Sequence, residues 1–225
     1  LGAREGRFGR RGEKKSMQPF AASSIPLVTL GTFLLWFGWF GFNGFSQLAM
    51  GTFDDVNAIS KIAVNTHLAG AAGTVTGAAL TRLIGGKTDI VMMLNGALSG
   101  LVAITAEPLT PGPITAMIIG SIGAVIMYYG TKMLENFGLD DVVGAIPVHM
   151  FAGIFGTLVV PFTNSDTSFG TQFVGVISVC IFSFVLSWIT FSTLKSTVGL
   201  RISKAAEKLG TDKAEVGVIA YSIRD

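Results

Sequence analysis

The sequence predicts an all-α membrane protein, a polytopic bundle of six transmembrane helices. Half of the 225 residues are hydrophobic, only 13% are charged, and the mean hydropathy is +0.61. Soluble domains carry about 25% charged residues, so much of this surface is expected never to meet water. In addition, the chain holds six apolar stretches, each close to the roughly 20 residues that a helix needs to cross a bilayer core.

The predicted spans are residues 25–44, 58–83, 89–106, 114–134, 141–162 and 172–197. Turn-rich loops join them, and none is long enough for a soluble domain. This division gives a basic cytoplasmic connecting loop at 1–24, a transmembrane region at 25–200 and a cytoplasmic tail at 201–225. The chain opens on Leu1 with a basic, glycine-rich segment in place of a signal peptide, and we expect it to be a fragment that lacks an upstream part.

Basic residues predict the orientation of the spans. If both ends of a six-span bundle face the cytoplasm, 15 of the 16 Lys and Arg lie inside and only Lys61 lies outside. Cytoplasmic loops of membrane proteins carry such an excess. We therefore expect an integral protein of the plasma membrane or bacterial inner membrane with both termini of this chain cytoplasmic. A net charge of +2 distributed in this way gives no reason to expect a nucleic-acid partner.

Small residues recur at helical spacing inside the predicted spans: Gly73 and Gly77, Gly96 and Gly100, and a stripe of Gly38, Gly41 and Gly44. Such residues let helix backbones approach closely where lipid supplies no hydrophobic drive between helices. Together they predict a compact bundle.

His149 is the main candidate for a functional residue. It lies inside the predicted span 141–162, and an ionisable group at that depth usually faces a polar cavity or pathway. A neutral imidazole offers one donor and one acceptor, which suits a small neutral hydride such as ammonia or water. Pro147 lacks an N–H, so it frees a backbone carbonyl and can bend the helix there. The alternative is a histidine that only hydrogen-bonds a neighbouring helix.

Two other features each have two interpretations. His67 follows Asn65 and Thr66 near the outer end of its span, and a polar contact between helices is favoured over a pore role. Six aromatic residues lie within residues 34–46. They fit either an interfacial aromatic belt or an outer vestibule whose ring faces attract a small cation.

The remaining acidic residues near span starts, Asp89, Asp140 and Asp141, are interpreted as helix caps. The sequence shows no HExxH, no cysteine pair, no phosphate loop and no Ser-His-acid set. We therefore expect no metal, no cofactor and no enzymatic activity.

Five motifs occur in one order along the chain: Gly38-Trp-Phe-Gly-Phe-Asn43 with Ser46, Asn65-Thr66, Gly96-Ala-Leu-Ser-Gly-Leu-Val102, Asp140-Asp141 through Val148-His149, and Val198-Gly-Leu-Arg201. Together they resemble the ammonium transporter (Amt/Mep/Rh) family over nearly the whole chain. The resemblance implies the C-terminal half of such a protein, from its sixth to its eleventh transmembrane helix, which is one repeat plus the extra last helix of the ammonium-transporter fold.

This resemblance also implies a mechanism and an assembly. The family forms homotrimers with one pore per subunit. Ammonium is recruited by aromatic faces and a hydroxyl, gives up its proton and crosses past a phenylalanine gate and two pore histidines. By motif match, Phe42 would line the gate, Ser46 would be the recruiting hydroxyl, Trp39 a pore-wall residue and His149 the second pore histidine.

The chain departs from the family pattern in three respects. The first pore histidine, the vestibule tryptophan and the second gate phenylalanine belong to helices outside this chain. Phe45 stands where the family usually has a small residue. In the tail, Val216 and Val218 replace the usual histidine and glutamate, which argues against control by a cytoplasmic nitrogen-regulatory protein.

Two hypotheses of function follow. The first is transport of ammonium or ammonia by the intact parent protein. The second is an ammonium sensor on the same scaffold, coupled to a signalling domain or partner, and the altered tail motivates it. A water or glycerol channel is disfavoured because paired Asn-Pro-Ala turns are absent from the sequence.

Overall fold

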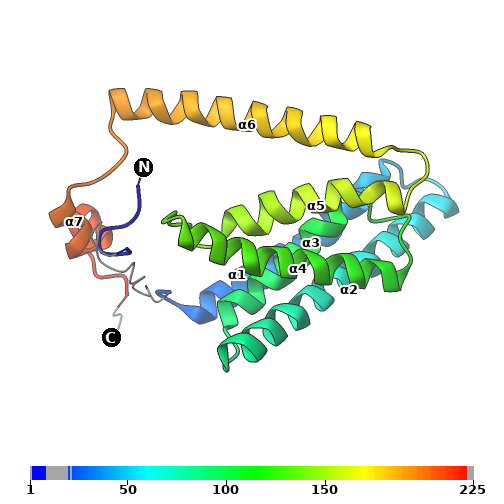
Figure 1. Cartoon of the computed structure of the whole chain (residues 1–225), viewed down its shortest axis with the longest axis horizontal. Helices are drawn as coiled ribbons and strands as arrows, with labels where there is room; N and C mark the ends of the chain where they lie inside the picture. The colour runs from blue at the N-terminus through cyan, green and yellow to red at the C-terminus, as the bar shows by residue number, and fades with distance from the viewer. Residues whose placement is uncertain (1, 9–19, 21, 222–225) are drawn as a thin grey trace. The chain divides into compact units, whose positions relative to one another are not determined.

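The computed structural model describes residues 2–8, 20 and 22–221, and the elements of this part are helical (Figure 1). The α-helices are α1 (Ile25–Gly44), α2 (Phe53–Gly85), α3 (Ile90–Thr105), α4 (Pro113–Asn136), α5 (Ala152–Val159), α6 (Phe169–Thr197) and α7 (Lys204–Leu209). Short 3-10 turns lie at Phe45–Gln47 and Val160–Phe162, and π-helices at Ile146–Phe151 and Asp212–Val216. The all-α prediction is confirmed, and each predicted span contains helix, although residues 141–144 of the fifth span are not helical.

Three helices are long and apolar enough to cross a membrane: Ile25–Gln47, α4 and α6. The apolar segments α3 and Ile146–Phe162 are shorter than a full crossing. Helix α2 has 33 residues but is less apolar, because Asn65, Thr66 and His67 lie in its middle. Length and composition of the helices therefore support three of the six predicted spans directly.

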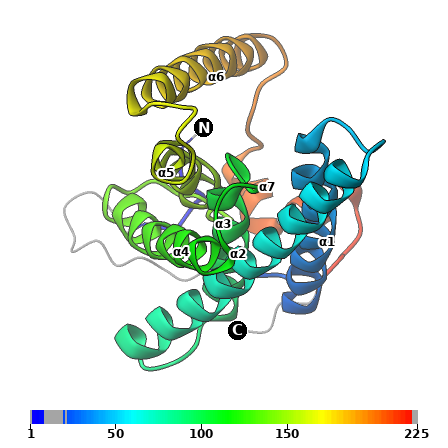
Figure 2. The ribbon, with the colours of Figure 1, turned by 90° about the vertical axis from the view of Figure 1, so that its right-hand side faces the viewer.

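The chain divides into two compact units, which we describe separately. The larger unit comprises Pro26–Met133 and Asp141–Ile177, and the smaller one comprises Leu1–Ile25, Leu134–Asp140 and Ser178–Asp225. In the larger unit, α2, α3, α4 and α5 lie side by side in both views (Figures 1 and 2).

Glycine pairs set the closest approach between α2 and α3. A Cβ added to Gly73 would collide with the carbonyl oxygen of Gly96, and one added to Gly77 would lie 2.9 Å from the carbonyl oxygen of Met92. The two backbones are therefore in direct contact, as predicted from the Gly-x-x-x-Gly pairs. The stripe on α1 behaves differently, since a Cβ at Gly38 would meet no described atom within 4 Å.

The core of the larger unit unites residues far apart in the sequence. Leu98 and Leu101 of α3, Met127 of α4 and Val148 of the first π-helix are buried together, with Trp36 and Trp39 of α1 packed against them. A second cluster contains Ala69, Ala103, Ile104, Ala116 and Ile119. These contacts fix α1, α3 and the π-helix relative to one another, and that arrangement positions the site described below.

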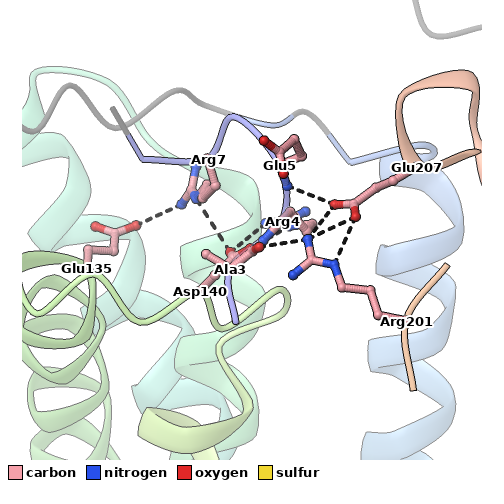
Figure 3. Close-up of polar contacts among 8 residues, drawn as sticks. All are labelled: Ala3, Arg4, Glu5, Arg7, Glu135, Asp140, Arg201 and Glu207. Carbon is pink, nitrogen blue, oxygen red and sulfur yellow. Dashed lines mark hydrogen bonds and ion pairs between the residues drawn. The ribbon is translucent and has the colours of Figure 1, made fainter. Parts of the chain in front are cut away.

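In the smaller unit, ion pairs join the N-terminal segment to the turn between Glu135 and Asp140 (Figure 3). The carboxylate of Asp140 accepts hydrogen bonds from the backbone N–H of Arg4 at 2.9 Å and from its Nε and Nη2 at 2.8 Å. Arg7 approaches both Asp140 and Glu135, at 3.5 and 3.3 Å. Hydrogen bonding from Arg4 holds the pKa of Asp140 below its usual value. The prediction that Asp140 caps a helix is therefore wrong, because its acceptor sites serve an arginine 136 residues away in the sequence.

The C-terminal tail joins the same network (Figure 3). Glu207 accepts a hydrogen bond from the backbone N–H of Glu5 at 2.7 Å and ion-pairs with Arg201 at 2.8 Å. Arg201 in turn donates to the carbonyl of Ala3 at 2.8 Å. The bond from the Glu5 amide, followed by that from Arg201, lowers the pKa of Glu207. The N-terminal segment thus bridges the Glu135–Asp140 turn and the tail.

Candidate functional site

His149 lies on the π-helix Ile146–Phe151, which begins with Pro147 at its second residue. Pro147 therefore lies in the first turn of the helix, where proline is tolerated because that N–H has no helical partner. The side-chain amide of Asn95 on α3 donates to the carbonyl of Val143, just before the helix, at 3.0 Å. The segment around His149 is a π-helix, a geometry that is frequent at functional sites.

Asp141 fixes the start of this segment. Its two carboxylate oxygens accept from the backbone N–H groups of Ala145 and Ile146, at 3.0 and 2.8 Å. These donors have no partner within the helix, so the prediction that Asp141 is a cap is confirmed. Asp89 likewise accepts from the N–H of Met92 at the start of α3.

A pocket of about 330 Å³ opens beside His149. It is lined by Trp39 and Phe42 of α1, Val102, Thr105 and Ala106 at the end of α3, and His149, Gly153 and Thr157 of the π-helix and α5. The structure therefore brings together three of the four residues proposed from the sequence: Trp39, Phe42 and His149.

The rings of the pocket are held in defined orientations. The indole Nε1 of Trp39 donates to the hydroxyl of Thr105 at 2.7 Å, and that hydroxyl donates to the carbonyl of Leu101 at 2.7 Å. The Trp39 and His149 rings are nearly parallel, at 16° with centroids 6.5 Å apart. Phe42 presents its edge to Trp39 at 5.8 Å and 69°. The wall of the pocket is thus aromatic and ordered.

Few polar groups in the pocket are open to a ligand. Thr105 is engaged as described, and the Thr157 hydroxyl donates to the carbonyl of Gly153 at 2.9 Å. Within the part of the chain that the structure describes, no hydrogen bond engages the His149 side chain. Its exposed imidazole, which lines the pocket, therefore has a donor and an acceptor available.

Ser46 and His67 lie outside the pocket lining. Ser46 is exposed in the 3-10 turn Phe45–Gln47 that follows α1. His67 of α2 contacts two rings of α1, Trp36 at 5.5 Å and Phe40 at 6.2 Å between centroids. This position agrees with the interpretation of His67 as a contact between helices.

Sequence reasoning missed five pocket residues: Val102, Thr105, Ala106, Gly153 and Thr157. A signal existed for Gly153 and Thr157, since they follow His149 by four and eight residues and so share its helix face. Nothing in the local sequence of α3 indicates that its end closes the pocket. For a metal, the described residues contain no group of three or more His, Cys, Asp or Glu able to hold one.

Comparison with known proteins gives the family of this chain. The profile described as the Ammonium Transporter Family matches residues 1–221. The chain belongs to the ammonium transporter family. This membership and the apolar helices make it an integral membrane protein.

Curated relatives include Ammonium transporter Amt2 of Archaeoglobus fulgidus, which is 38% identical over 98% of this chain and 50% of its own length. A putative ammonium transporter of Synechocystis sp., sll0537, is 36% identical over 96% of this chain and 40% of its own length. The chain thus spans about half the length of the curated relatives it matches.

Solved structures similar to this chain belong to proteins with Amt or Mep in their titles. A structure titled Sensor Amt Protein is 33% identical and superposes with a TM-score of 0.86 over 95% of this chain and 54% of its own. Candida albicans Mep2 is 25% identical, with a TM-score of 0.76 over 90% of this chain and 48% of its own. The expected ammonium-transporter fold is therefore confirmed.

Proposed function

We propose that the intact protein conducts ammonium or ammonia across the membrane and that the pocket beside His149 is part of the conduction path. The observation that carries this proposal is an imidazole, set on a π-helix and without a protein hydrogen-bond partner among the described residues, in a pocket walled by Trp39 and Phe42. An apolar helix holds such a group at a cost, which is offset if a small polar solute passes beside it.

The residues of the pocket suit successive steps of transport. The ring faces of Phe42 and Trp39 attract a cation, and an apolar pocket disfavours charge, so ammonium transfers a proton to solvent water at the mouth of the pocket, which gives hydronium and neutral ammonia. Neutral ammonia then meets His149, which can donate to its lone pair or accept from an N–H. In this proposal Phe42 lines the gate, Trp39 forms the wall and Ser46, exposed one turn beyond Phe42, is the recruiting hydroxyl.

The test is His149→Ala in the full-length protein, reconstituted in vesicles, with uptake of methylammonium and exclusion of potassium measured together. We expect uptake or selectivity to change strongly. His67→Ala is the matched control, because that histidine also lies in a predicted span but is absent from the pocket lining. Unchanged uptake and selectivity in His149→Ala would refute the proposal.

The same proposal includes a topology and an assembly. Six spans, residues 1–24 and 201–225 on the cytoplasmic side, and a homotrimer are its components, and the distribution of Lys and Arg supports the orientation. Reporter fusions in the connecting loop and in the tail test the orientation. Cross-linking in native membranes tests the trimer.

A sensor is the second candidate, favoured by the TM-score of 0.86 to the structure titled Sensor Amt Protein and by Val216 and Val218 in the tail. We propose that a sensor would bind ammonium at the same pocket and pass the signal to a fused or partner domain. The sequence after Asp225 discriminates between the two candidates. A kinase-type or cyclase-type domain there would favour sensing, whereas a stop codon would favour transport without a nitrogen-regulatory partner at the tail.

A further inference from the structure

Glu107 follows directly after Thr105 and Ala106, which line the pocket. Three donors hold its carboxylate. The backbone N–H groups of Leu109 and Thr110 reach one oxygen at 3.2 Å each, and the side-chain amide of Asn164 reaches the other at 2.7 Å. These three hydrogen bonds fix the position of the Glu107 carboxylate.

A buried side chain of α2 also holds the loop that carries Glu107. Asn65 of α2 is buried, and its amide donates to the carbonyls of Pro108 and Pro111 at 2.9 and 2.8 Å. Asn164 lies in the turn between the 3-10 turn Val160–Phe162 and α6. The loop is thus bonded to α2, and its carboxylate to the turn before α6.

Among the residues that the structure describes, no basic side chain pairs with Glu107. All three hydrogen bonds are accepted by its oxygens, which is the pattern of an ionised carboxylate. The nearest Lys and Arg in the sequence are Lys87 and Lys132, 20 and 25 residues away. A fixed negative charge beside an apolar pocket attracts cations, because low-dielectric walls concentrate its field.

We propose that Glu107 is a specificity-determining residue at the rim of the pocket, where its fixed charge concentrates the ammonium cation before entry and repels anions. This inference rests on the proposed transport function and deepens it. The charge acts on the approaching cation and not on neutral ammonia inside the pocket. It should therefore lower KM and leave the maximal rate unchanged.

Glu107→Gln tests the charge at nearly constant shape. The glutamine retains a carbonyl oxygen for Leu109 and Thr110, and Asn164 can rotate its amide to accept from the new NH2 group. In vesicles of the full-length protein made from uncharged lipid, we expect KM for methylammonium to rise about threefold at low ionic strength, with the maximal rate unchanged. The difference from wild type should vanish near 1 M salt, where the screening length is about 3 Å.

Two control variants separate charge from structure. Asp166→Asn removes an exposed carboxylate on the same loop as Asn164, and we expect KM to stay at the wild-type value. Asn164→Ala removes the hydrogen bond from Asn164 to Glu107 but keeps the charge of Glu107. The KM of this variant should therefore retain the wild-type dependence on salt. The proposal is overturned if Glu107→Gln leaves KM unchanged, raises it equally at all salt concentrations, or is matched by Asp166→Asn. A normal His149→Ala phenotype would instead refute the proposed function itself.

Discussion

The two units of this chain are held together by opposite physical means. In the larger unit, helices meet through glycines and buried apolar side chains. In the smaller unit, three segments distant in the sequence meet through carboxylates and arginines (Figure 3). The smaller unit also contains most of the apolar helix α6, so the contrast concerns the contacts between its other segments. Close van der Waals packing works in lipid, whereas charge pairs are retained where water can solvate their edges.

This contrast teaches where each unit is vulnerable. Backbones in contact cannot absorb an added side chain, so the larger unit should respond steeply to small changes in volume. Ion pairs tolerate changes in shape but respond to charge, pH and salt. Four predictions, all for the full-length protein, test this division from the largest expected effect to the smallest.

Gly73→Val should have the largest effect. The new side chain would be driven into the carbonyl oxygen of Gly96, and we expect a loss of more than about 3 kcal/mol or failure to fold. Unfolding in mixed detergent micelles measures this loss. Gly38→Ala is the control, since its Cβ would meet no described atom within 4 Å, and it should change stability by less than about 0.5 kcal/mol. Equal losses in the two variants would mean that α1 also packs through its glycine stripe.

Asp140→Asn should have the next largest effect. The side chain of Asp140 is only 3% exposed, and it faces both Arg4 and Arg7. Removing its charge leaves two arginines without their shared partner, which we expect to weaken attachment of the N-terminal segment by about 2 kcal/mol. Hydrogen exchange at the Arg4 amide measures this attachment.

Lys204→Met is the matched control for that substitution. The Lys204 side chain is 79% exposed in its pair with Glu5, and exposed pairs contribute about 0.5 kcal/mol or less. If the control weakened the segment as much as Asp140→Asn does, burial would not be what makes the Asp140 pair strong.

The third prediction concerns pH. Because Arg4 lowers the pKa of Asp140 in the folded protein, the pair contributes stability above the unfolded pKa of about 3.9. That contribution is lost as pH falls through the lower folded value. Exchange at the Arg4 amide, corrected for its intrinsic rate, should therefore accelerate below about pH 4 in wild type. The acceleration should be absent from Asp140→Asn, and its persistence there would assign the effect to another carboxylate.

Thr105→Val should have the smallest effect. It removes the acceptor for the Trp39 indole N–H but keeps the volume of the side chain, and we expect a loss of about 1 kcal/mol. Because Trp39 and His149 share the pocket, methylammonium uptake should fall while assembly stays intact. Thr74→Val, at a threonine that bonds only within its own helix, should leave uptake unchanged. Equal uptake in the two variants would show that the orientation of Trp39 is unimportant.

Features controlled by near neighbours could be predicted from the sequence. The helices and the caps at Asp89 and Asp141 each depend on residues within a few positions along the chain. The contact between Gly-x-x-x-Gly pairs was also predictable, since only small residues permit it. By the same reasoning Asp140 resembled a cap, because nothing nearby reveals an arginine that competes for it.

By itself, the sequence determined the helical membrane class and the family and singled out His149 as a candidate, because hydropathy, helical period and motif order are properties of short segments. Tertiary structure alone decided that Trp39, Phe42 and Thr105 surround that histidine, that Ser46 and His67 lie elsewhere, and that Asp140 binds Arg4. Such pairings join residues tens to more than a hundred positions apart. They are selected by which helix faces fit together, and no local pattern records that choice.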